Sequence, residues 1–112
     1  MILKWFRTKD VDDFADSLVA DMLRRFPPAG VEATERKANE KLQKTHRAIF
    51  SRVEAFAKST DLNVYRTARL GNRVKWSLAE AGYRKPFVDA FTHELVALST
   101  IAAKAKRKNV NK

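Results

Sequence analysis

Glycine and proline are scarce in this chain, and their positions limit where its regular structure can break. The sequence holds 3 glycines and 3 prolines in 112 residues. Most of them fall in two short stretches, residues 27–30 and 82–86, which separate long runs with apolar residues at helical spacing. This distribution predicts an all-α chain of long helices with few breaks.

The first two helices are predicted from the apolar stripes between these breaks. One helix begins after Asp10, a suitable N-cap, and ends at Pro27. The next helix runs from about Glu32 to about Lys58, with negative charge in its first turn, where the helix dipole favours it.

Two further helices complete the pattern. The polar stretch 59–61 offers caps for a third helix that runs through Ala81, and Gly82 is its natural C-terminal stop. Gly71 inside this helix predicts the close approach of a neighbouring helix, because glycine there otherwise costs up to about 1 kcal/mol relative to alanine. Pro86 suits the first turn of the fourth helix.

Short connections between consecutive helices favour antiparallel neighbours. The predicted fold is therefore an antiparallel, up-down four-helix bundle with a short N-terminal segment. Hydrophobic residues make up 45% of the chain, which is enough for the core of one domain. We expect residues 1–103 to form this domain, and residues 104–112 to form a flexible basic tail that frays into solvent.

The chain is strongly basic. Lysine and arginine number 23 against 13 aspartates and glutamates, which gives a formal net charge of +10 and a pI near 10.2. Such a surface attracts polyanions. The excess is uneven, because the first predicted helix is acidic, whereas the third helix and the C-terminal tail are basic. The sequence therefore predicts one acidic side on an otherwise basic molecule.

A helical wheel places the arginines of the third helix opposite its apolar face, with two aromatic residues beside them. Such rings can stack on bases while the arginines hold phosphates, or they can make internal cation–π contacts. The lysines of the second helix lie away from its apolar stripe. They are either further contacts to phosphates or a solvated face in which Glu40 reduces the repulsion between the lysines. The candidate nucleic-acid-binding residues are Arg66, Arg69, Arg73, Trp76, Tyr65, Lys37, Lys41, Lys44, Lys106 and Arg107.

The sequence offers few features that could support catalysis. It contains no cysteine, no GxSxG motif, no glycine-rich phosphate loop and no HExxH motif, so we expect neither enzyme activity nor a cofactor. Asp12 and Asp16 lie one turn apart, but the helix dipole explains carboxylates there better than a shared metal ion does. His46 and His93 lack a second ligand at helical spacing, and we expect His46 to be packed and His93 to be solvated.

Residues 74–91 fit a helix-turn-helix template in part, with Gly82 in the turn. The template requires an apolar residue where Ser77 stands, and its recognition helix would carry Asp89 and Glu94 instead of arginine or asparagine. An antiparallel hairpin uses the same glycine as a plain helix stop, and it is the preferred interpretation.

The expected function is that of a non-enzymatic domain that binds DNA or RNA mainly through phosphate contacts. One alternative is a protein-interaction or assembly module that docks an acidic protein surface or self-associates through the fourth helix, where Val96 and Ile101 lie off the main stripe. Another is peripheral binding to anionic membranes through Trp5 and Phe6, unless these residues cover Trp76 instead. The lack of cysteine, of a signal-peptide core and of a spanning segment predicts a cytoplasmic protein.

Overall fold

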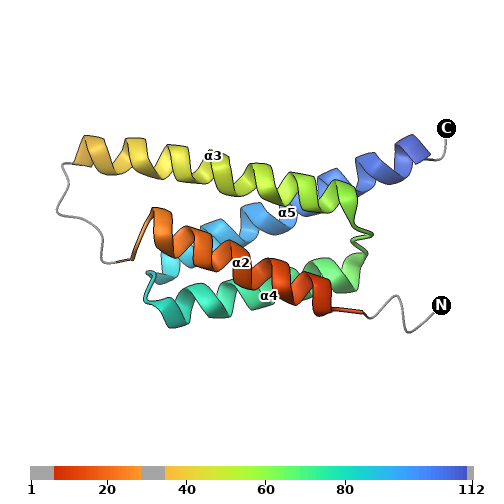
Figure 1. Ribbon diagram of the computed structural model, residues 1–112, viewed down its shortest axis with the longest axis horizontal. Helices are drawn as coiled ribbons and strands as arrows, with labels where there is room; N and C mark the ends of the chain where they lie inside the picture. Colours follow the sequence, from red (N-terminus) through yellow and green to blue (C-terminus); the bar gives the residue numbers. More distant parts are fainter. Residues whose placement is uncertain (1–6, 29–34, 111–112) are drawn as a thin grey trace.

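The structure of the chain, a computed structural model, describes residues 7–28 and 35–110, with side chains for residues 7–28 and 39–106. Figure 1 shows helices arranged along one long axis. They are α2 (Lys9–Arg25), α3 (Glu35–Ser59), α4 (Val64–Ala81) and α5 (Lys85–Val110). Within the described ranges these helices form a four-helix bundle without strands, which confirms the predicted all-α fold.

Each helix packs on two others, and the packing partners differ from the sequence order. Consecutive helices run in opposite directions along the bundle (Figure 1). The helices α3 and α4 each pack on α2 and α5, so α3 and α4 lie at opposite corners of the bundle. Of the three expected antiparallel neighbours, α2 with α3 and α4 with α5 pack together, whereas α3 and α4 do not pack as expected. By contrast, α2 with α4 and α3 with α5 are parallel pairs, which the sequence pattern did not predict.

The core lies between the helices and consists of aliphatic side chains at helical spacing. The largest fully buried apolar side chains are Leu18, Met22, Ile49, Leu70, Leu78, Leu95, Val11, Val53 and Val74. Aromatic rings continue the core towards the α4–α5 turn, where the centroid of Phe87 lies 5.2 Å from that of Tyr83 and 5.9 Å from that of Phe91. The Tyr83 hydroxyl donates a hydrogen bond of 2.6 Å to the carbonyl oxygen of Phe26, which ties α2 to this end.

The helix ends follow the predicted pattern only in part. The predicted N-cap at Asp10 is wrong. The helix α2 begins at Lys9 after the N-cap residue Thr8, so Asp10 lies in its first turn. The cap of α4 is Asn63, whose Oδ1 accepts a hydrogen bond of 2.8 Å from the backbone N–H of Arg66, and not the stretch 59–61. Gly82 ends α4 with a φ of 103°, a left-handed conformation that glycine adopts without strain, so the predicted stop is confirmed.

Close packing of α4 on α5 explains the glycine inside α4. A Cβ atom on Gly71 would lie 2.7 Å from Cγ2 of Val96, so only a residue without a side chain fits there. The predicted close approach of a helix at Gly71 is therefore confirmed. Because α4 and α5 pack extensively as an antiparallel pair, residues 74–91 form a hairpin and not a helix-turn-helix.

The expected fraying beyond Lys104 is not observed, because α5 continues to Val110. Lys106 belongs to this helix, and its Nζ lies 3.4 Å from Oδ1 of Asp61, in the connection between α3 and α4. The predicted placement of Lys106 in a free basic tail is therefore wrong. The side chain of Arg107, predicted to lie in the same tail, is outside the described residues.

Candidate nucleic-acid interface

The arginines of α4 face the aspartates of α2. The guanidinium of Arg69 donates two hydrogen bonds to Asp12, from Nε at 3.0 Å and from Nη2 at 3.1 Å. Arg73 does the same with Asp16, at 2.8 and 2.9 Å. Both arginines therefore form bidentate pairs, the geometry in which a guanidinium holds a carboxylate most firmly.

Arg66 is buried, with 8% of its side chain exposed. Its guanidinium donates to the carboxylate of Asp10 and, at 2.5 Å, to the backbone carbonyl of Asp61. The prediction that Arg66 faces solvent is thus wrong. Arg69 and Arg73 are partly exposed, at 44% and 38%, but they are paired with aspartates and not free as expected. The reason is that α2 packs on α4, which brings the acidic side of one helix against the basic side of the other.

These contacts cancel charge locally. Hydrogen bonds from Arg69 lower the pKa of Asp12 below its ordinary value, and those from Arg73 lower the pKa of Asp16. Both carboxylates are therefore ionised at neutral pH, and each neutralises one arginine. The predicted division into an acidic side and a basic side is wrong at this interface. Asp12 and Asp16 are bound by arginines, which leaves them poorly placed to share a metal ion.

A second acidic centre joins α2 to α3. Asp21 accepts hydrogen bonds from Arg24 at 2.6 Å, from Arg25 at 2.8 Å and from Arg52 of α3 at 3.1 Å. Burial acts to raise the pKa of Asp21, but the hydrogen bonds from these arginines outweigh it, so the pKa is lowered. The aspartates of α2 thus bind arginines of both neighbouring helices.

The aromatic residues predicted to stack on bases lie on the outside of α4. Trp76 is 65% exposed and Tyr65 is 40% exposed. The hollow beside Trp76 has a volume of about 490 Å³ and is lined by Arg69, Asn72, Arg73, Trp76, Ser77 and Glu80. The segment with Trp5 and Phe6, predicted as a possible cover for Trp76, lies outside the described residues. The charge beside this indole is balanced, because both arginines are paired with aspartates.

Three cations in the N-terminal half of α3 have no partner among the described side chains, unlike the arginines of α4. Lys41, Lys44 and Arg47 are exposed, and none of them makes an ion pair or hydrogen bond with another described side chain. We call these residues the α3 basic face. Lys41 and Lys44 were predicted as contacts, whereas Arg47 was missed although it continues their three-residue spacing. The side chain of Lys37 lies outside the described residues.

The C-terminal half of α3 carries balanced charge instead. Lys58 pairs with Glu54 at 2.8 Å, and Arg52 pairs with Asp21. Among the side chains of α3 that the structure describes, those of residues 39–59, uncompensated positive charge is therefore concentrated between residues 41 and 47.

His46 lies at the edge of the α3 basic face and is only half packed, with 49% of its side chain exposed. Its ring stacks on Phe50 with centroids 4.4 Å apart, and its Nε2 lies 2.5 Å from Oε2 of Glu94 on α5. The expectation of a packed histidine is met on one ring face only. His93 is exposed, as expected.

Other cations without an ion-pair partner among the described side chains are dispersed. Lys75 lies on α4, Arg84 and Lys85 lie at the α4–α5 turn, and Lys104 lies near the far end of α5. These residues provide charge-matched controls for the α3 basic face.

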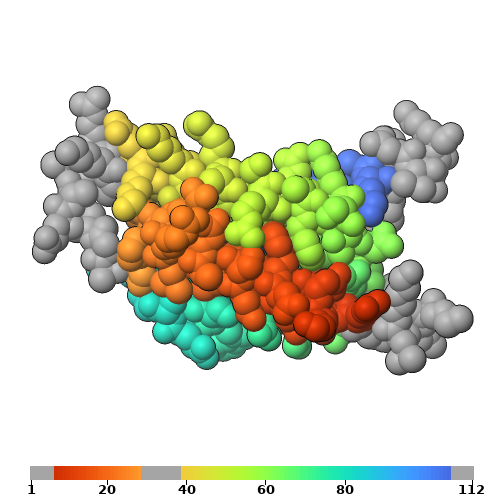
Figure 2. All heavy atoms as spheres, viewed as in Figure 1, coloured from red at the N-terminus to blue at the C-terminus, as the bar shows by residue number. Residues whose placement is uncertain are grey.

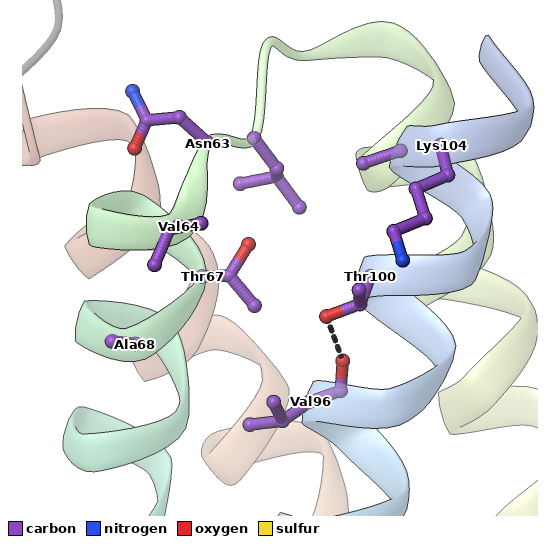
Figure 3. A pocket seen from close by; sticks show the side chains of 9 residues that line it. Asn63, Val64, Thr67, Ala68, Val96, Thr100 and Lys104 are labelled. Carbon is purple, nitrogen blue, oxygen red and sulfur yellow. Dashed lines mark hydrogen bonds between the residues drawn. The ribbon is translucent and has the colours of Figure 1, made fainter. Parts of the chain in front are cut away.

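An apolar groove of about 240 Å³ runs between α4 and α5 (Figure 3). Val64, 84% exposed, lies on the α4 side and Val96 on the α5 side. Thr100, one turn beyond Val96 on α5, donates a hydrogen bond of 2.8 Å to the carbonyl of Val96. Lys104 is the charged residue at its rim. Of the two residues of α5 expected to be buried off its main stripe, Val96 is partly buried and packs at Gly71, whereas Ile101 is 65% exposed.

Comparison with known proteins supplies no relative. No family model matches the chain, and neither the curated proteins nor the solved structures contain a match. In the described part of the chain, no helix combines the length and apolar character needed to cross a membrane. The same residues contain no group of three or more histidines and carboxylates that could hold a metal ion.

Proposed function

We propose that this chain binds nucleic acid through phosphate contacts made by the α3 basic face, Lys41, Lys44 and Arg47. The observation that supports this proposal is the difference between two basic helices. The arginines of α4 are paired with aspartates, whereas the three cations of α3 are exposed and have no partner among the described side chains. Cations that neutralise no carboxylate among the described side chains are available to a polyanion.

The residue types determine the kind of contact. Lysine and arginine bind phosphate oxygens and displace the counterions that surround a nucleic acid. Two exposed amides, Asn39 and Gln43, lie near the α3 basic face, whereas its three defining residues are all cations suited to phosphates. Binding through this face is therefore expected to depend strongly on salt and more weakly on base sequence.

Fluorescence anisotropy with a labelled mixed-sequence DNA tests the proposal. If three phosphates are neutralised, affinity falls about 40-fold between about 50 and 200 mM salt. Binding that is undetectable at low ionic strength, with both DNA and RNA, would remove the proposal.

A second candidate function is the docking of a protein partner on the outer face of α4. Exposed tryptophan beside ordered arginine is the combination that dominates binding energy at protein interfaces. Trp76 lies in its hollow with Arg69 and Arg73, which Asp12 and Asp16 hold in place. Self-association would show as a concentration-dependent mass in sedimentation that Trp76→Ala abolishes. Attachment to anionic membranes through Trp5 and Phe6 stays a prediction, because these residues lie outside the described ones.

A further inference from the structure

Among the described residues, the large exposed aromatic rings, Tyr65 and Trp76, lie on a different helix from the α3 basic face. This separation bears on the kind of nucleic acid that the face can hold. Resting on the proposed function, we infer that the α3 basic face binds duplex nucleic acid in preference to single strands. A single strand needs cations and stacking rings within reach of each other. A duplex needs only cations that match the positions of its phosphates.

The rings on the described part of α3 offer little area to a base. Phe50 is 8% exposed, and Phe56 is stacked on Phe14 with ring centroids 4.0 Å apart. One face of the His46 ring is covered by Phe50 and its Nε2 is held by Glu94, which leaves only the other face of this imidazole exposed. The α3 basic face therefore has no large aromatic ring on which a base could stack.

The exposed rings of Tyr65 and Trp76 belong to α4, at the corner of the bundle opposite α3. Figure 2 shows α2 lying between α3 and α4 on one face of the molecule. A strand that crossed this face would meet the exposed carboxylates of Asp13 and Asp16. The route across α5 exposes Asp89 and Glu94 instead. A strand whose phosphates bind at α3 would therefore meet repulsive carboxylates on either route before one of its bases reached Trp76.

The loss of stacking weighs against single strands, because each base stacked on an aromatic ring improves affinity by roughly 5- to 150-fold. The geometry of the three cations suits a duplex. Residues three apart on a helix differ by about 60° around its axis, so Lys41, Lys44 and Arg47 spread over about 120° and about 9 Å of rise. Such a spread reaches phosphates on both sides of a groove, and a duplex has a higher charge density than a single strand.

The test compares a labelled mixed-sequence duplex of about 20 base pairs with an oligo(dT) strand of about 20 nucleotides, by anisotropy at low salt. Wild type and Trp76→Ala are measured with both probes. Trp76 is 65% exposed, so its truncation leaves the core intact. We expect the duplex to bind at least about 5-fold more tightly than oligo(dT), and Trp76→Ala to change either affinity by less than about 2-fold.

Two results would overturn this inference while leaving the proposed function in place. One is oligo(dT) binding that is as tight as duplex binding. The other is a loss of at least about 5-fold in oligo(dT) affinity in Trp76→Ala, which would show that a base stacks on this indole. If neither probe binds, the proposed function itself fails, and the preference for duplex fails with it.

Discussion

Arg69 holds Asp12 by two parallel hydrogen bonds, of 3.0 and 3.1 Å, across the interface between the parallel helices α2 and α4. This contact has two consequences. It ties α2 to the bundle through polar groups in addition to its apolar stripe, and it removes a cation from the surface that α4 could offer a polyanion. The pairs of α2 and α4 are thus structural, whereas the unpaired cations of α3 remain available for binding.

The aspartates of α2 should make the fold sensitive to acid. The pKa values of Asp12, Asp16 and Asp21 are lowered from 3.8 in the folded state, so the unfolded chain binds more protons at acidic pH. The contribution of these three carboxylates to the free energy of unfolding is therefore complete above about pH 5 and is lost as pH falls through about 4 and below. Urea unfolding followed by circular dichroism at a series of pH values measures this loss.

The double variant Asp12→Asn with Asp16→Asn is expected to show a flatter dependence on pH, because two of the three carboxylates are gone. Asp89→Asn is the control, since Asp89 is exposed on α5 and makes no ion pair with a described residue. Equal slopes in both variants would contradict the role assigned to the α2 aspartates.

Arg66→Ala should be strongly destabilising. The side chain is 8% exposed and joins Asp10, which is 46% exposed, to the backbone of the α3–α4 connection, so its removal takes away a buried side chain and two hydrogen bonds. We expect the free energy of unfolding to fall by about 1–3 kcal/mol. The matched control is Arg84→Ala, at an exposed arginine without a carboxylate partner in the described structure, which should change stability by less than about 0.5 kcal/mol. Similar losses in the two variants would refute the assignment.

Gly71→Ala should also destabilise the fold, although alanine favours helix by up to about 1 kcal/mol. The new Cβ would lie 2.7 Å from Cγ2 of Val96, and the stiff valine side chain gives way poorly. A net loss of about 1–3 kcal/mol is expected. In the double variant with Val96→Ala much of this loss should be recovered, because the clashing methyl is absent. A Gly71→Ala protein more stable than wild type would show that the helices are less closely packed.

The sequence predicted the helices well because each depends on local signals. Apolar spacing, Pro86 in the first turn of α5, and Gly82 after α4 placed three of the boundaries within a few residues. Gly71 even predicted a close helix contact. These features can be recognised in the sequence of a single helix, because the period of its apolar stripe determines which face is buried.

Which helices would pair could not be read from any one helix. Considered alone, the aspartates of α2 and the arginines of α4 both look like solvated faces. The missed signal was their common spacing, since Asp12 and Asp16 are four residues apart, as are Arg69 and Arg73. Two complementary rows with one spacing indicate neighbouring helices. The direction follows only from the order of the pairs in the structure, Asp12 with Arg69 and Asp16 with Arg73. The α3 basic face was found in part, because its residues depend on exposure alone and not on a partner helix.

The most direct test of the account compares two double charge reversals that alter the net charge equally. Lys41→Glu with Lys44→Glu acts on the α3 basic face, and Lys75→Glu with Lys104→Glu acts on exposed lysines of α4 and α5. Anisotropy with duplex DNA over a range of salt concentrations should show an affinity loss above about 10-fold and a salt slope smaller by about 2 for the first variant only. Equal losses for the two variants would contradict a localised phosphate-binding face. They would show that binding depends only on the net charge of the chain.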